Sequence, residues 1–330
     1  MGADGLFELR RRTFDTPHFR GIEFIEVEAK SIINHVPGNY LPFNWTINPY
    51  RGCTHACVYC FARVTHTYMD LNAGRDFETK IVVKVNAGER LRKELRAKRW
   101  KGEHVAMGTA TDPYQRAEGR YKLMPKIITA LAEVRNPFSI LTKGTLILRD
   151  LDLLREAAAM TDVSTALSIG TLDEEAWRRS EPGTPHPRKR IEAVAKLNAA
   201  GVQCGVMVAP VLPGISDGVD QLRDVVIAAL DAGATHVSPI LLHLRPGVKE
   251  VYMEWLRENY PDLVPRYEAM YRRSAYAGSA DKTTVGTIVS DLVSERGHHG
   301  PRPSPNRKRS WRRRRATIEV DQDSEQLTLL

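Results

Sequence analysis

Short apolar runs alternate with amphipathic stretches through the middle of the chain. The apolar runs are rich in β-branched residues and bounded by turn residues, which is typical of buried strands. They predict six strands, at 45–48, 104–108, 138–142, 163–169, 202–209 and 236–241. The stretches between them repeat apolar residues at helical spacing and predict helices at 90–98, 126–135, 149–160, 188–200 and 217–232. A further alternating run at 80–85 predicts an accessory strand.

Strands that alternate with helices build a parallel sheet through right-handed crossovers. Six such units fall short of the eight that close a complete barrel. The sequence therefore predicts an α/β fold, an incomplete (β/α)6 parallel barrel, over residues 44–241. We expect a lead-in at 1–43, a helical C-terminal extension at 242–294 and a basic, flexible tail at 295–330.

Positive charge is concentrated near the C-terminus. The 330 residues carry a formal net charge of +8, and the segment from Arg302 to Arg315 alone holds eight Arg and Lys and no acidic residue. Such a segment can neutralise nucleic-acid phosphates, and Trp311 within it can stack on a base. The same composition is equally typical of a solvated tail. Nucleic-acid contact through this segment is therefore one of two expectations.

No stretch of the sequence is apolar and long enough to span a membrane, which needs about 20 such residues. The N-terminal residues also lack the apolar core of a signal peptide. From these two observations we expect a cytoplasmic protein that does not contact a membrane.

Three of the four cysteines lie together directly after the first predicted strand, at Cys53, Cys57 and Cys60. Three thiolates can hold three irons of a [4Fe–4S] cluster and leave the fourth iron open to a chelating ligand. Ligands of parallel α/β sheets bind at the carboxyl ends of the strands, where we expect this loop. Zinc held by the three cysteines with His55 or His66 is the alternative. Cys204 lies within an apolar predicted strand, and we expect it in the core.

The C-x3-C-x2-C loop, with Tyr59 before its last cysteine, resembles the cluster loop of the radical S-adenosylmethionine (SAM) superfamily. Its context, NPYRGCTHACVYCFAR followed by TDPYQ and LTK, is similar to the branch related to spore photoproduct lyase. The resemblance implies an enzyme that cleaves SAM reductively at a [4Fe–4S] cluster. The product is a 5′-deoxyadenosyl radical, which abstracts hydrogen from a substrate. An external one-electron reductant of the flavodoxin or ferredoxin type would supply the electron.

The resemblance also implies which residues bind the cofactors. The three cysteines would ligate the cluster, and the SAM contacts would be Tyr59, Thr111, Asp112, Lys143 and Ser168. Lys143 matches a lysine that contacts the SAM carboxylate, and charged side chains in the loop 178–182 could reach the ribose or carboxylate. Ordinary structural roles are the alternative: Asp112 as a turn cap, Lys143 in solvent and Ser168 bonded within its own turn. No catalytic residue is implied.

Two positions depart from the photoproduct lyase branch. Thr109 stands where that branch has a hydrogen-donating cysteine, and Phe61 where it has a tyrosine. Both changes argue against thymine-dimer repair and favour an unknown substrate. The alternatives are a nucleic-acid repair lyase with another hydrogen donor, and a non-catalytic nucleic-acid-binding protein with an Fe–S or zinc site. After the barrel, aromatic residues between 252 and 276 are expected in the core or in a lid over the substrate.

Overall fold

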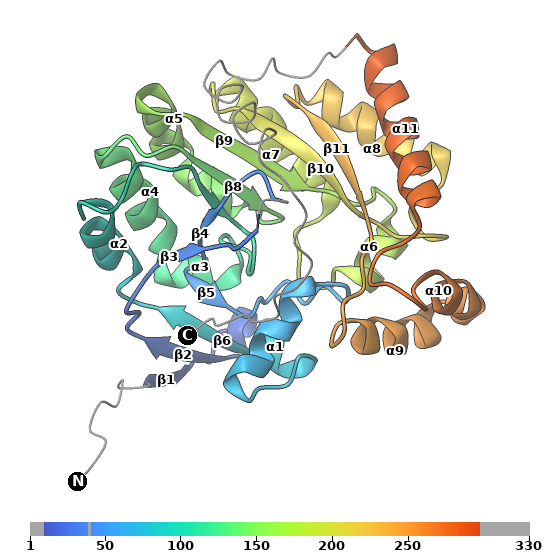
Figure 1. Cartoon of the computed structure of the whole chain (residues 1–330), viewed down its shortest axis with the longest axis horizontal. Helices are drawn as coiled ribbons and strands as arrows, with labels where there is room; N and C mark the ends of the chain where they lie inside the picture. The colour runs from blue at the N-terminus through green and yellow to red at the C-terminus, as the bar shows by residue number, and fades with distance from the viewer. Residues whose placement is uncertain (1–9, 39–40, 298–330) are drawn as a thin grey trace. The chain divides into compact units, whose positions relative to one another are not determined.

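Six neighbouring parallel strands form most of a seven-stranded sheet in the computed structural model, which describes residues 10–38 and 41–297 (Figure 1). Their order across the sheet is β11 (Val237–Leu241), β10 (Cys204–Val211), β9 (Val163–Ser168), β8 (Phe138–Thr142), β7 (Val105–Met107) and β4 (Trp45–Ile47). At the far edge, β3 (Ile33–His35) pairs antiparallel with β4. The strands β11 and β3 do not pair, so the sheet is an open partial barrel, as predicted.

All six predicted strands are present, and their ends differ from the predicted ones by at most two residues. The helices predicted between them are α2 (Ala87–Leu95), α4 (Leu123–Glu133), α5 (Leu151–Met160), α7 (Pro187–Ala199) and α8 (Val219–Asp231). They pack as neighbours along the sheet, α2 against α4, α4 against α5 and α7 against α8. Buried apolar side chains of strands and helices together form the core between these layers.

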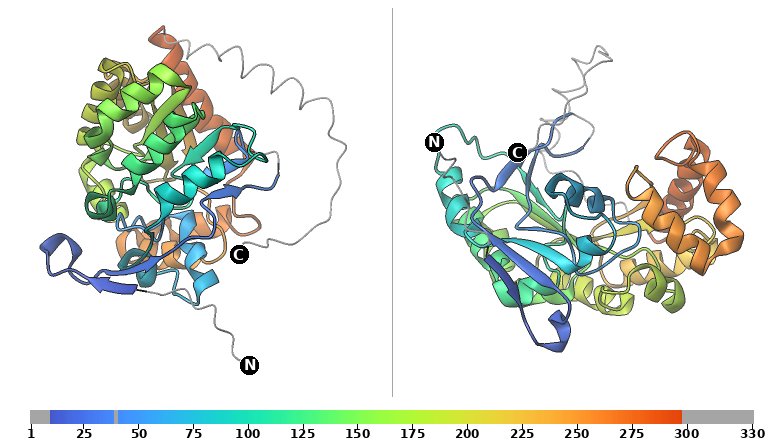
Figure 2. Two further views of the ribbon diagram at one scale, coloured as in Figure 1. Left: turned by 90° about the vertical axis from the view of Figure 1, so that its left-hand side faces the viewer. Right: turned by 90° about the horizontal axis from the view of Figure 1, so that it is seen from below.

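A second, four-stranded sheet anchors the start of the cysteine loop. Its strands, in order, are β1 (Arg10–Thr13), β2 (Glu23–Val27), β6 (Lys80–Lys84) and β5 (Tyr50–Arg51). The predicted accessory strand is β6, whereas β1 and β3 were not predicted because they are short and, in β1, fully exposed. The turn between β1 and β2 projects away from the rest of this part of the chain in both views of Figure 2.

The segment predicted as a lead-in is bound to helix α2. The Asn86 side chain accepts a hydrogen bond from the Ala29 amide at 2.8 Å and donates to the Ala29 carbonyl at 3.1 Å. Glu94, which is buried, accepts bonds from the amides of Ile32 and Ile33. Asn86 thus precedes the helix as predicted, but its side chain joins two segments instead of capping the helix.

The C-terminal extension contains α9 (Lys249–Asn259), α10 (Val264–Met270) and α11 (Ser279–Glu295). Tyr252, Tyr267 and Tyr271 are buried and their rings pack against one another, so three of the six aromatic residues between 252 and 276 belong to the core. None of the helices in residues 10–38 and 41–297 is long and apolar enough to cross a membrane. The basic segment from Arg302 to Arg315 lies outside the described residues.

Candidate functional site

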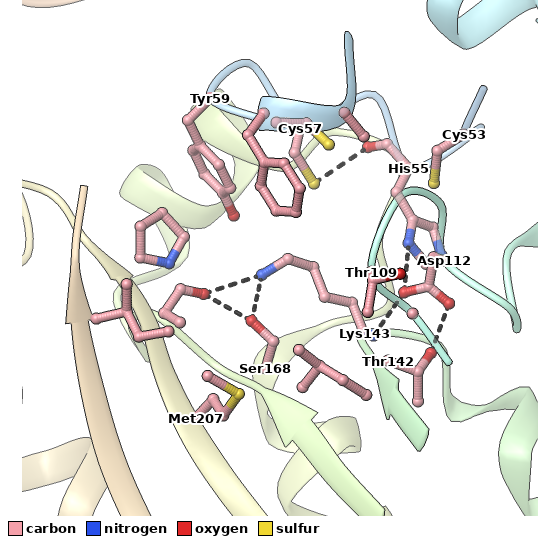
Figure 3. A pocket seen from close by; sticks show the side chains of 18 of the residues that line it. Cys53, His55, Cys57, Tyr59, Thr109, Asp112, Thr142, Lys143, Ser168 and Met207 are labelled. Atoms are coloured by element: carbon pink, nitrogen blue, oxygen red, sulfur yellow. Dashed lines mark hydrogen bonds and ion pairs between the residues drawn. The ribbon is translucent and has the colours of Figure 1, made fainter. Parts of the chain in front are cut away.

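A cavity lies at the carboxyl ends of the parallel strands, and all eight predicted cofactor-binding residues line it (Figure 3). Three thiols come from the loop after β5, and Tyr59 comes from the same loop. Thr111 and Asp112 follow β7, Lys143 follows β8, and Ser168 ends β9. The sheet therefore brings together residues that are far apart in the sequence, because parallel strands end at the same edge.

Arg63, whose side chain is buried, binds the backbone of the cysteine loop. Its guanidinium donates to the carbonyl of Cys57 at 3.0 Å and to that of Ala56 at 3.2 Å. The same group pairs with Glu78 on α1 (Arg75–Thr79) at 3.1 Å. The loop's conformation is therefore fixed by contacts within the protein, which suits a loop that must present three thiols together.

Thr111 and Gln115 bind the cysteine loop from the β7 side. The Thr111 hydroxyl donates to the Gly52 carbonyl at 2.7 Å, and the Gln115 side chain donates to the same oxygen at 2.9 Å. The side-chain oxygen Oε1 of Gln115 accepts a hydrogen bond from the backbone amide of Thr54 at 2.9 Å. Thr111 thus lines the cavity while its hydroxyl positions the loop, and Gln115, which sequence reasoning missed, acts with it.

Asp112 joins the ends of β7 and β8. One carboxylate oxygen accepts from the Thr142 hydroxyl at 2.6 Å and the other from the Lys143 amide at 2.7 Å. The imidazole of His55 lies 3.3 Å from the second oxygen. Burial acts to raise the pKa of Asp112, but His55 and the bonds from Lys143 and Thr142 outweigh it and hold the pKa below its usual value. Asp112 is therefore an ionised carboxylate at the cavity wall.

Gly108 permits the close approach of the strand ends at this point. Its φ of +88° lies in the left-handed region, which favours glycine. A Cβ atom there would lie 1.9 Å from the carbonyl oxygen of Leu141. A side chain at this position would therefore separate the loops that carry Asp112 and Lys143.

The ammonium of Lys143 lies inside the cavity, and Figure 3 shows its side chain extended toward Ser168. Its Nζ donates to the Ser168 hydroxyl at 2.8 Å and to the Ala209 carbonyl at 3.2 Å. Its partner of opposite charge is Glu181, with 2.9 Å between Nζ and Oε1. Lys143 is thus a largely buried cation and not a solvated surface lysine.

Glu181 accepts from four surrounding side chains, one of which is the Thr184 hydroxyl at 3.2 Å from Oε2. The Tyr59 hydroxyl and Lys143 donate to Oε1, and Arg190, which is 1% exposed, donates to Oε2 at 2.5 Å. Burial acts to raise the pKa of Glu181, but the charges of Arg190 and Lys143 outweigh it and hold the pKa well below the usual range. Two cations therefore face one carboxylate in this buried group.

Residues 178–180, predicted in a loop, are instead the end of a helix, and Glu181 contacts the cavity-lining Lys143 and Tyr59 without lining the cavity itself. Arg178 and Arg179 instead form ion pairs with Glu174 and Glu175 on α6 (Glu174–Ser180), at 2.6 and 2.5 Å. Sequence reasoning also missed Arg190, although one signal was present. Arg190 shares the buried face of α7 with Ala193, Val194 and Leu197, and a charged residue in an apolar stripe indicates a buried partner.

The two residues that depart from the photoproduct lyase branch lie at the cavity. The Thr109 hydroxyl lies 3.3 Å from the Asn48 side-chain oxygen. Phe61 is 42% exposed, and its ring contacts His243, which stacks on Tyr276 at 5.5 Å between ring centroids. Phe61 and His243 both line the cavity, and Tyr276 packs against His243.

The donor set fits an iron–sulfur cluster better than a single zinc ion. All four cysteines are free, and the three of the loop face one cavity. Across residues 10–38 and 41–297, no three His, Cys, Asp or Glu side chains are grouped to hold one metal ion. His66 does not line the cavity; its Nε2 lies 2.9 Å from the Lys80 carbonyl oxygen, while His55 faces Asp112. The thiols of Cys53, Cys57 and Cys60 line one cavity without converging on a single point, an arrangement that suits ligation of three different irons of a cluster.

Comparison with known proteins agrees with this geometry. The family model described as the radical SAM superfamily matches residues 47–226. An uncharacterised protein of Mycobacterium tuberculosis is 48% identical over 296 residues, which cover 88% of this chain and 87% of that protein. The radical SAM Nalpha-GlyT isomerase of Pseudomonas phage M6 is 27% identical over 194 residues, or 57% of this chain and 37% of that one.

Among solved structures, the fold matches a spore photoproduct lyase mutant with bound SAM and dinucleoside spore photoproduct. The TM-score is 0.63 at 15% identity, over 87% of this chain and 85% of that one. At this identity the match concerns the fold, which is the same open arrangement of parallel strands. The family match covers more than half of the chain. The chain belongs to the radical SAM superfamily.

Proposed function

We propose that this chain is a radical SAM enzyme that holds a [4Fe–4S] cluster at Cys53, Cys57 and Cys60 and binds SAM in the adjoining cavity. The observation that carries this proposal is that three free thiols and a buried lysine face the same cavity. When bound, the two cofactors supply reductive cleavage of SAM, whose 5′-deoxyadenosyl radical takes a hydrogen atom from the substrate. The protein's part is to bind, orient and exclude water.

The residues around the cavity have separate tasks in this proposal. Lys143 binds the carboxylate of SAM, because the buried group of Lys143, Arg190 and Glu181 has one positive charge more than it has negative. Ser168 holds the Lys143 ammonium in place. Thr111 fixes the cysteine loop, and Asp112 accepts from the SAM amino group while it joins the strand ends. The ring of Tyr59 forms part of the wall beside the cluster.

The experiment that tests this proposal is anaerobic. The protein is reconstituted with iron and sulfide, reduced with dithionite and incubated with SAM. We expect about four irons per chain and formation of 5′-deoxyadenosine and methionine. One zinc per chain with intact SAM would instead favour the non-catalytic binding protein. In the cell, we propose that an external reductant of the flavodoxin or ferredoxin type supplies the electron.

Replacing Lys143 with methionine is expected to weaken SAM binding about 10- to 100-fold while the iron content stays unchanged. Hydrogen bonds to charged groups contribute about 1.5–3 kcal/mol, which corresponds to this range. Equilibrium dialysis of the reconstituted protein measures the affinity. Lys189→Met is the control, because Lys189 is exposed on α7 and its ammonium pairs with Glu192, far from the cavity-lining residues in the sequence. Equal SAM affinity of the wild type and Lys143→Met would contradict the proposal that Lys143 binds SAM.

A nucleic-acid substrate is a second candidate, and the charge of the segment from Arg302 to Arg315 favours it. Deleting residues 302–330 is expected to weaken binding of a single-stranded oligonucleotide by at least about 10-fold at low salt, because up to eight phosphate contacts are lost. Fluorescence anisotropy measures this binding, and SAM affinity is the control, expected to be unchanged. Equal oligonucleotide affinity before and after the deletion would contradict a role for this segment.

A further inference from the structure

We propose that Glu181 is a positioning residue that fixes Lys143 and Tyr59 at the cavity and so couples the cysteine loop to the lysine end of the site. This inference rests on the proposed function, because it assumes that SAM binds beside Lys143. It goes further by assigning a role to a carboxylate that touches neither cofactor. Glu181 lies in the loop between α6 and α7, where the sequence pattern predicts no structure.

The two carboxylate oxygens of Glu181 have different partners. Oε1 faces the cavity side and accepts from the Tyr59 hydroxyl and from Lys143. Oε2 faces the opposite side and accepts from Arg190 and from the Thr184 hydroxyl at 3.2 Å. One carboxylate therefore joins a residue of the cysteine loop, a residue after β8 and a residue of α7.

Arg190 makes this carboxylate rigid. Its guanidinium also donates to the Ser168 carbonyl at 3.0 Å and to the Pro185 carbonyl at 2.9 Å. The first bond attaches it to the end of β9, and the second to the loop that carries Glu181. The position of Glu181 is thus set by the sheet itself, which a surface ion pair could not achieve.

The charges explain why Lys143 depends on Glu181. Without the carboxylate, Lys143 would have only the neutral oxygens of Ser168 and Ala209 as partners, and the buried Arg190 would lie close to it as an unpaired cation. Repulsion between two desolvated cations favours a rotamer that takes the flexible lysine toward solvent. Glu181 therefore holds Lys143 where a carboxylate ligand would meet it.

The backbone on either side of Glu181 is docked on the cysteine loop. The Val58 amide donates to the Ser180 carbonyl at 3.1 Å, and the Gly183 amide donates to the His55 carbonyl at 3.0 Å. A Cβ atom on Gly183 would lie 2.2 Å from the Thr54 carbonyl oxygen, so the two segments are in close contact. Displacement of the cysteine loop would therefore move Glu181, and with it Lys143.

A double-mutant cycle between Glu181→Gln and Lys143→Met tests this role, with SAM affinity measured by equilibrium dialysis at equal iron content. We expect Glu181→Gln to weaken SAM binding about 10-fold in the wild type. In the Lys143→Met background we expect less than about a 2-fold further change, because Glu181 acts through the lysine. Glu174→Gln is the control, since it removes only an exposed ion pair on α6.

Additive losses in this cycle would overturn the inference, because a merely structural residue would weaken binding whether or not Lys143 is present. If Glu181→Gln does not fold, the variant Tyr59→Phe tests the proposal instead. It removes only the tyrosine hydroxyl that donates to Oε1 of Glu181. We then expect about a 3-fold weaker affinity for SAM with full iron content, and unchanged affinity would overturn the proposal. A wild-type protein that holds the cluster and does not bind SAM would instead contradict the proposed function.

Discussion

Alanine at any one of Cys53, Cys57 and Cys60 is expected to abolish formation of 5′-deoxyadenosine from SAM. Each thiolate would hold one iron, and among the described residues Cys204, the fourth cysteine, does not line the cavity. No thiol is therefore available to replace the one removed. Because second-sphere changes alone cost 10- to 100-fold at metal sites, we expect losses above about 100-fold for a ligand. Iron and sulfide per chain and product formation after dithionite reduction measure the effect.

Cys204→Ala is the matched control for these three variants. Cys204 is fully buried at the start of β10, and its thiol lies 3.6 Å from the carbonyl oxygen of Gly205. Its replacement removes a small apolar group from the core, so we expect a modest loss of stability with normal iron content. A Cys57→Ala protein that kept four irons and full product formation would show that the cluster is not held by this loop.

The sequence was sufficient for the main sheet because buried parallel strands leave a strong local signal. The run at 138–142 became β8 without any change at its ends, since its residues are apolar and bounded by turns. The position of the site followed from the same pattern. Cys53, Asp112 and Lys143 each follow a strand closely in the sequence. Parallel pairing therefore brings them to the edge of the sheet where the strands end. Local pattern and topology therefore predicted where the strand ends meet, and the family resemblance indicated which residues there to single out.

Residues whose role depends on tertiary contact were not predictable in this way. Gln115 binds the cysteine loop 61 positions away, and His243 lines the cavity from the segment after β11. Glu181 follows the end of α6, where the neighbouring Arg178 and Arg179 are also charged but pair with Glu174 and Glu175 of the same helix. Composition cannot distinguish among such residues, because only the path of the folded chain decides which of them contacts the side chains that line the cavity.

The structure also refines the roles that family resemblance suggested. The Thr111 hydroxyl donates to the backbone of the cysteine loop, and both oxygens of Asp112 already accept bonds from the end of β8. These residues therefore combine a structural role with their place at the cavity wall. Lys143 differs, because its partners are two side chains and one carbonyl that a bound carboxylate could join. We therefore expect its replacement to separate SAM binding from folding.

Replacing Arg190 with methionine is expected to lower the free energy of unfolding by about 3–5 kcal/mol, because it leaves Glu181 as a buried carboxylate without its main partner. The methionine fills much of the same space, so the loss reports on charge more than on packing. Chemical denaturation of the cluster-free protein, followed by circular dichroism under reducing conditions, measures it. Arg178→Met is the control; that residue is 69% exposed and its ion pair with Glu174 contributes at most about 1 kcal/mol.

The pH dependence of this loss distinguishes a charge effect from a packing effect. In the wild type, Arg190 and Lys143 hold the pKa of Glu181 well below its usual range, so its stabilising effect persists at mildly acidic pH. In Arg190→Met only Lys143 remains as a cation beside Glu181, so the pKa of Glu181 rises, and protonation relieves the less compensated buried charge as the pH falls. The difference in unfolding free energy between the two proteins should therefore narrow as the pH falls from 7 into the acidic range in which Glu181 of the variant takes up a proton. A difference that stays constant over this range would show that Arg190 stabilises the fold by packing alone.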